Sequence, residues 1–229
     1  MHYKCFKEII SEERMRRYIN ACDGNERKAM ALYRYNLTLS SEMFKIISVF
    51  EVALRNKITL IMEPFLGEDW LRDSCLAGGI FDTPRTIGTK KVIGRAYDGL
   101  VNLNSYTPTK LLAEMEFGVW KYMYSAPEYM ATGQKLLRVF PNKPQSTPTA
   151  QISNRQIFNE LNSVNKLRNR IAHHEPICFS AHRQIKSISY AKCEYQRMMK
   201  LFSWMGIDSG ELLRGIDYVD DSFQKILNL

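Results

Sequence analysis

One segment in the C-terminal half of the sequence carries residue types that could act on a phosphodiester. It reads SNRQIFNELNSVNKLRNRIAHHE over residues 153–175 and contains Arg168, Asn169 and His173 close together. An arginine offers a two-pronged donor to phosphate oxygens, and an amide can orient a hydroxyl or a neighbouring ring. An imidazole can accept or donate a proton near neutral pH. A phosphodiester could therefore use the three side chains together.

The spacing in this segment predicts a helix with one core-facing stripe. Apolar residues recur every three or four positions, as in an amphipathic helix: Ile157, Leu161, Val164 and Ile171. Arg168 falls on the same stripe, where the period predicts another apolar residue. A charged side chain in such a place is costly unless it is paired or lines a cavity, so Arg168 is a candidate functional residue.

A polar line runs beside this stripe. Asn162, Asn169 and His173 are spaced so that they share a face of the predicted helix, with Asn165 or Lys166 between them. Asparagine is a mediocre helix former, so helix propensity does not explain this line. We expect Pro176 to end the helix, which places His173 and His174 in its last turn, with His174 turned toward the side of Arg170 and Leu167.

Other interpretations of the same residues remain open. Arg168 could pair with a carboxylate across a helical bundle, and the two histidines could cap the helix end. A metal site built from His173, His174, Glu175, Cys178 and His182 is the weaker alternative. Adjacent histidines point to different sides of a helix, and there is no second pair of ligands. We therefore expect neither a metal nor a cofactor.

The elements that position these residues are all predicted to be helical. Helical periods are readable in most of the chain, and no alternating segment demands a strand. The expected fold is all-α, in a single domain over residues 1–229, with a weakly readable insertion at 64–106. The predicted helices cover residues 12–22, 26–37, 40–64, about 84–100, 107–123, about 153–175, 180–205 and 209–228, and a loop is expected at 141–148.

Composition limits the classes of function. The 229 residues are 45% hydrophobic, enough for a substantial core, and the net charge of +8 raises the expectation of a nucleic-acid partner. The five cysteines are scattered and form no pair of metal-ligand spacing, as expected of free thiols in a reducing compartment. Charges interrupt the most hydrophobic stretch, residues 43–62, so it is a poor membrane span. The start of the chain lacks the apolar region of a secretion signal, and the expected location is the cytoplasm.

Three blocks of the sequence resemble the Abi-like family of abortive-infection proteins in the HEPN superfamily. The segment LRNRIAHHEPI contains an arginine and a histidine in the R-x4-6-H spacing of that superfamily, at Arg168 and His173. Residues 32–56 resemble the family's N-terminal block, in which a helix carries a glutamate and an Arg-Asn pair, here Glu51, Arg55 and Asn56. Residues 111–124 resemble the family's middle block around a Phe-Gly pair.

The resemblance implies a HEPN-type helical bundle that forms a homodimer, with its active site where two R-x4-6-H motifs converge. It further implies metal-independent RNA cleavage in phage defence or as the toxin of a toxin–antitoxin pair, in which the ribose 2′-hydroxyl attacks its own phosphate. His173 would act as acid or base, with His174 beside it. Arg168 would hold the phosphate, and Asn169 would position the others.

Supporting residues and partners follow from this hypothesis. Glu51 and Arg55 stand four positions apart, which suits an ion pair within a helix. With Asn56, Asn162 and Arg170 they are candidates to support the site or to contact RNA. Expected partners are substrate RNA, an inhibitory RNA, a second copy of the chain and an antitoxin. The alternatives are a non-catalytic RNA-binding regulator and an all-α protein–protein interaction module.

Overall fold

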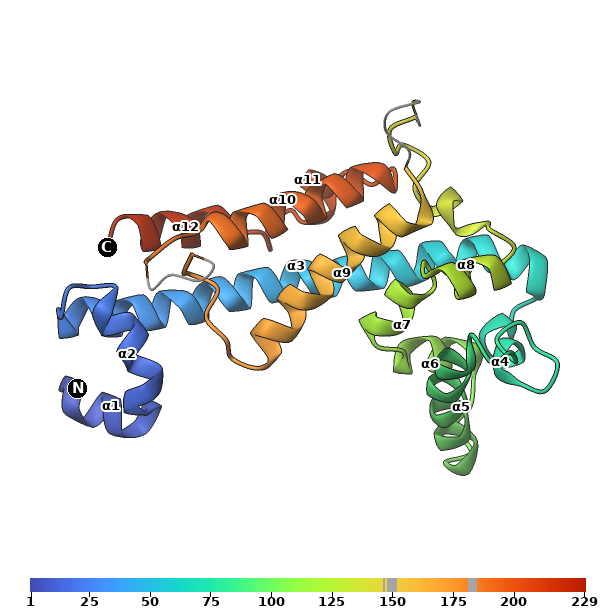
Figure 1. Cartoon of the computed structure of the whole chain (residues 1–229), viewed down its shortest axis with the longest axis horizontal. Helices are drawn as coiled ribbons and strands as arrows, with labels where there is room; N and C mark the ends of the chain where they lie inside the picture. Colours follow the sequence, from blue (N-terminus) through green and yellow to red (C-terminus); the bar gives the residue numbers. More distant parts are fainter. Residues whose placement is uncertain (146, 148–151, 181–184) are drawn as a thin grey trace. The chain divides into compact units, whose positions relative to one another are not determined.

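The computed structural model describes residues 1–145, 147, 152–180 and 185–229, and this part of the chain is all-helical, as predicted (Figure 1). Within it the only strand-like pairing is an isolated antiparallel bridge between Phe179 and Lys186. None of its helices is long and apolar enough to cross a membrane. The helices are α1 (Tyr3–Ile10), α2 (Glu12–Asn20), α3 (Glu26–Leu66), α4 (Trp70–Cys75), α5 (Ile87–Asn102), α6 (Pro108–Glu114), α7 (Phe117–Tyr122), α8 (Ala126–Ala131), the 3-10 helix η1 (Leu136–Val139), α9 (Asn154–Ala172), α10 (Ser189–Trp204), α11 (Ser209–Leu212) and α12 (Val219–Leu227).

Residue contacts divide the chain into two compact units, each assembled from separate stretches of sequence. Unit 1 comprises Met1–Ser48, Lys166–Met199 and Ser209–Leu229, and unit 2 comprises Val49–Asn165 and Lys200–Asp208. The single domain expected over 1–229 stays a prediction. The stretch 64–106, which the sequence left hard to interpret, supplies α4 and α5 to unit 2.

Unit 1 is held together by aromatic rings from its ends. Phe6 of α1 and Tyr18 of α2 each make an edge-to-face contact with Tyr33 of α3, at 5.5 and 5.3 Å between ring centroids. Tyr18 also packs on Phe179 at 5.1 Å. Such contacts add to the burial of apolar surface, so they fix α1 and α2 on the first half of α3. In Figure 1 these are the blue helices at the N-terminal end.

Helix α3 corrects two boundary predictions. It runs without interruption from Glu26 to Leu66, whereas the sequence predicted one helix to residue 37 and a second from Ser40. Leu39 and Met43 are both fully buried, so the core stripe continues across the two serines, and packing outweighs their modest helix propensity. Pro64 lies inside the last turn, and the helix ends at Leu66, directly before Gly67. This glycine has a left-handed φ of 85°, and its N–H donates to the Glu63 carbonyl at 2.9 Å.

Unit 2 packs around Phe50, which lies against Phe202 at 5.2 Å and Phe117 at 6.2 Å. Thr107 caps α6, and its side chain accepts a hydrogen bond from the Lys110 N–H. The helix predicted from 107 through 123 is nevertheless two helices, α6 and α7. Glu116 has an extended backbone between them (φ −75°, ψ 159°), and this lets the following Phe117 enter the core completely.

The C-terminal boundaries also differ from those predicted. Of the helix expected at 180–205, residues 181–184 lie outside the described residues. Helix α10 begins at Ser189, after the antiparallel bridge between Phe179 and Lys186. The helix expected at 209–228 is divided into α11 and α12. Ser153 caps the start of α9, because its Oγ accepts a hydrogen bond from the Gln156 N–H. Of the predicted loop at 141–148, residues 146 and 148 lie outside the described residues.

A buried amide connects two distant segments of unit 1 and supplies a test of this packing. Asn36 is 3% exposed, and its Oδ1 accepts a hydrogen bond from the fully buried Ile177 N–H at 2.9 Å. Asn36→Ala leaves that donor without a partner, and we expect it to lower the free energy of unfolding by about 1–3 kcal/mol. Urea denaturation measures the change. Asn102→Ala, on the exposed side of α5, is the matched control. Equal stability of the two variants would show that the amide does not hold unit 1.

Candidate functional site

Helix α9 ends in a turn built around a left-handed histidine. Its last helical residue is Ala172, and His174 has a φ of 56°. The His174 N–H donates to the Ile171 carbonyl at 3.0 Å, and the Glu175 N–H donates to the Arg170 carbonyl at 2.8 Å. These bonds form a Schellman motif, which usually has glycine at the left-handed position, although histidine tolerates that conformation better than most residues. The predictions that Pro176 ends the helix near 175 and that both histidines lie in its last turn are therefore wrong.

Two arginines hold the carbonyls of this turn. Arg14 of α2 donates from Nη1 to the His174 carbonyl at 2.8 Å, and Arg170 donates from Nη2 to the Pro176 carbonyl at 2.9 Å. The Arg170 guanidinium also pairs with Glu175 at 3.5 Å and lies over the Tyr190 ring, 5.0 Å from its centroid. Arg170, which the sequence named as a supporting residue, thus fixes the chain after α9. Hydrogen bonds from charged donors to carbonyls are among the stronger ones in proteins.

The turn forms one wall of a basic hollow within unit 1, with a volume of about 470 Å³. Helix α2 forms the other wall and contributes three arginines. Ser11 sets its start, because its Oγ accepts a hydrogen bond from the Arg14 N–H. The residues that line this basic hollow are Ser11, Glu13, Arg14, Arg16, Arg17, Tyr18, His173, His174, Glu175 and Pro176.

The chemistry of the basic hollow suits an anionic ligand. Both imidazoles are exposed, and so are the guanidinium groups of Arg14 and Arg16. Arg16 pairs with Glu13 at 2.6 Å, and Arg17 lies over the Phe179 ring at 4.4 Å. The guanidinium groups can bind phosphate oxygens, and the imidazoles can transfer protons. The sequence interpretation missed the α2 arginines, although their clustering with a serine cap was a readable signal.

Arg168 and Asn169 are not among the residues that line the basic hollow. Both are half-buried, and Arg168 Nη1 donates to Asn169 Oδ1 at 3.4 Å. The prediction that Arg168 takes a position on the core stripe is wrong, because Leu167 is fully buried there and Ile171 is only half-buried. The stripe advances by three residues from Val164 to Leu167, which a period of 3.6 permits as readily as an advance of four.

The remaining candidates belong to unit 2. Asn162 accepts a hydrogen bond from the Lys121 ammonium at 3.3 Å, and Lys121 is only 6% exposed. The same ammonium lies over the rings of Tyr122 and Phe158, at 4.2 and 5.4 Å from their centroids. Lys121 is a buried cation that the sequence interpretation missed, although a lysine inside the apolar run FGVWKYMY was a visible anomaly.

The motif residues of α3 have different environments. Glu51 and Arg55 are half-buried, and Arg55 Nε has no hydrogen-bond partner in the part of the chain that the structure describes. Arg55 also forms no ion pair there, so the expected pair with Glu51 is not observed. Asn56 is exposed and lines a separate cavity of unit 2.

The alternative metal site finds no support among the described residues, which contain no group of three histidine, cysteine, aspartate or glutamate side chains placed to hold an ion. Cys178 is buried, and burial raises the pKa of its thiol to about 12. His182, the last of the proposed ligands, lies outside the described residues.

In a comparison with known proteins, the sequence model of one family covers the residues of both walls of the basic hollow. The sequence model of a family described as Abi-like protein matches residues 3–178, a range that includes α2, the end of α9 and the motif residues of α3. No curated protein and no solved structure matches the chain. The match covers well over half of the sequence. The chain therefore belongs to the Abi-like protein family, and this membership indicates a role in abortive infection.

Proposed function

We propose that this protein is a metal-independent endoribonuclease of the HEPN superfamily that acts in phage defence. The observation that carries the proposal is the basic hollow, where two exposed imidazoles stand opposite the arginines of α2. A phosphodiester needs cationic donors for its charge and a group that can move protons. Both are present on the two walls of one hollow.

In the proposed reaction, cationic groups bind the phosphate and imidazoles transfer the protons. His173 removes the proton from a ribose 2′-hydroxyl, and the freed oxygen forms a bond to the adjacent phosphorus. The bond from that phosphorus to the 5′-oxygen of the next nucleotide breaks, and this oxygen takes a proton from a second imidazole. The products are a 2′,3′-cyclic phosphate and a 5′-hydroxyl. As the family motif implies, Arg168 would hold the phosphate and Asn169 would position the others, although neither lines the basic hollow of the same chain.

A second candidate function is a non-catalytic RNA-binding regulator. The observation that favours it is that Arg168 and Asn169 do not line the basic hollow that contains the histidines. A single chain then offers a cationic surface and imidazoles without the arginine of the motif beside them. Binding without cleavage would distinguish this function from the nuclease, and an antitoxin or an inhibitory RNA would compete for the same surface.

The nuclease is tested with purified protein and labelled total RNA in the presence of EDTA. We expect cleavage by the wild type and a loss of roughly two to four orders of magnitude in His173→Ala, because general acid–base assistance is of that size. His174→Asn is expected to retain most of the activity. Asparagine tolerates the left-handed backbone of residue 174, so this change removes the imidazole without disturbing the turn.

The outcomes of that assay separate the alternatives. Arg168→Ala, with a melting temperature equal to that of the wild type, should be as inactive as His173→Ala. If His174→Asn is inactive while His173→Ala cleaves normally, the roles of the two histidines are reversed. If the wild type binds RNA without cutting it, the regulator is the correct function. A protein that neither binds nor cuts RNA is an interaction module.

RNA affinity should depend steeply on salt because guanidinium groups displace counterions from phosphates. Arg16→Gln is expected to weaken binding of single-stranded RNA and to reduce the slope of log affinity against log salt by about 0.7, the value for one phosphate contact. Fluorescence anisotropy between low and physiological salt measures the slope. Arg27→Gln removes the same charge from an exposed position of α3 outside the basic hollow. Equal slopes for the two variants would exclude Arg16 from the RNA surface.

We further propose that the active form is a homodimer, in which His173 of the partner subunit supplies the second imidazole. A two-fold interface doubles a set that is thin in one chain. Light scattering at micromolar concentration should give twice the mass of the chain. RNA cleavage by mixtures of Arg168→Ala and His173→Ala protein should exceed that of either variant alone if the two subunits share one site. A monomer with full nuclease activity would contradict the dimer.

A further inference from the structure

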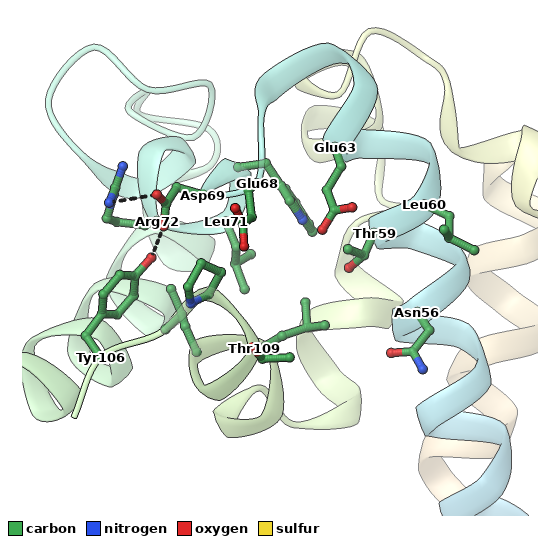
Figure 2. A pocket seen from close by; sticks show the side chains of 14 residues that line it. Asn56, Thr59, Leu60, Glu63, Glu68, Asp69, Leu71, Arg72, Tyr106 and Thr109 are labelled. Atoms are coloured by element: carbon green, nitrogen blue, oxygen red, sulfur yellow. Dashed lines mark hydrogen bonds and ion pairs between the residues drawn. The ribbon is translucent and has the colours of Figure 1, made fainter.

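A second cavity lies in unit 2, with walls from α3, α4, α6 and the segment before α6 (Figure 2). Its volume is about 330 Å³, which suits a small ligand or a single long side chain. It shares no residue with the basic hollow. The lining residues include Asn56, the exposed member of the α3 motif, for which the proposed nuclease has no direct use.

One side of this cavity is apolar and already fixed. Trp70, Leu71 and Leu111 line it and are at most 4% exposed. Tyr106 donates a hydrogen bond to Asp69 Oδ1, and Arg72 pairs with Asp69 Oδ2 at 3.1 Å. Burial and this contact with Asp69 raise the pKa of Tyr106, so the phenol keeps its proton. The Asp69 charge is thus satisfied within the protein, and the wall is preorganised.

The other side presents acceptors without a partner among the described residues, on half-buried Glu63 and Thr59 and on exposed Glu68. Figure 2 shows the carboxylates of Glu63 and Glu68 directed into the same space as the Thr59 hydroxyl. Within the described residues neither carboxylate forms a hydrogen bond or an ion pair. Thr59 Oγ1 is buried and also lacks a hydrogen-bond partner there. A buried polar atom without a partner is costly, so a ligand that supplies a donor is favoured.

We propose that this cavity binds a primary ammonium group carried on an aliphatic chain. An ammonium has three donors and no acceptor, which matches Glu63, Glu68 and Thr59. The apolar side then covers the methylene groups, as it would cover the stem of a lysine. An anion is disfavoured, because Arg72, the one cation among the described lining residues, is engaged with Asp69 and Asp73 at 3.1 and 2.8 Å. The proposal is independent of the nuclease and involves other residues.

Isothermal titration calorimetry with 1,5-diaminopentane tests the proposal on the full chain. We expect one binding site per chain and a weakening of roughly tenfold in each of Glu63→Gln and Glu68→Gln, because each loses a charge-assisted hydrogen bond. Glu8→Gln makes the same charge change at an exposed position of α1 outside the cavity and should bind like the wild type. Equal weakening in all three variants would mean a diffuse attraction to the surface and would overturn the proposal.

A filling variant separates the cavity from its charge. Thr109→Phe, on the exposed first turn of α6, places a ring at a position that lines the cavity while both carboxylates remain. We expect it to abolish binding with little change in melting temperature. Unchanged affinity in this variant would exclude the cavity as the site.

The source of the ammonium is resolved by a second titrant. A short peptide with one lysine is compared with the same peptide acetylated on that lysine. Tighter binding of the unmodified peptide than of the diamine identifies a basic side chain of a protein partner as the occupant, whereas binding of the diamine alone identifies a free amine. If neither titrant binds, the proposal is wrong.

Discussion

The left-handed turn at His174 is the constraint on which the candidate nuclease site depends. A histidine in this conformation has a cost of about 1–3 kcal/mol that glycine would avoid, so the surrounding bonds must hold it there. Two arginines do so through the carbonyls of His174 and Pro176. Glycine would end the helix more easily but would offer no side chain to the basic hollow. The strain is thus understandable if residue 174 contributes a side chain to the basic hollow.

The same turn explains why an element from the start of the chain belongs to the site. Arg14 contacts the end of α9 because Tyr18, one turn further along α2, is packed between Tyr33 and Phe179. Burial raises the pKa of the Tyr18 phenol, which therefore remains neutral beside the arginines. Packing and charge therefore cooperate on α2, because the buried ring fixes the helix and the exposed guanidinium groups face the histidines. A variant that disturbed Tyr18 would change the site without touching it.

Sequence periodicity was sufficient for the fold class and for several caps, but not for features set by distant contacts. Ser11, Thr107 and Ser153 cap helices as their local sequence predicts. Helix α3 continues past Ser40 because Leu39 and Met43, on either side of the serines, pack in the core. The end of α9 depends on Arg14, which is far away in the sequence. The predicted position of Arg168 is wrong for another reason. A period of 3.6 leaves Leu167 and Arg168 equally plausible on the core side. The cluster of arginines in α2 can be seen in the sequence, but only the fold shows that it lies beside the end of α9.

The surplus of positive charge is distributed unevenly over the sites of the two units. The basic hollow of unit 1 gathers arginines and histidines, whereas the cavity of unit 2 gathers carboxylates in a chain whose net charge is +8. A phosphate would be repelled by Glu63 and Glu68, and an ammonium would be repelled by Arg14 and Arg16. Each site therefore disfavours the class of ligand proposed for the other site.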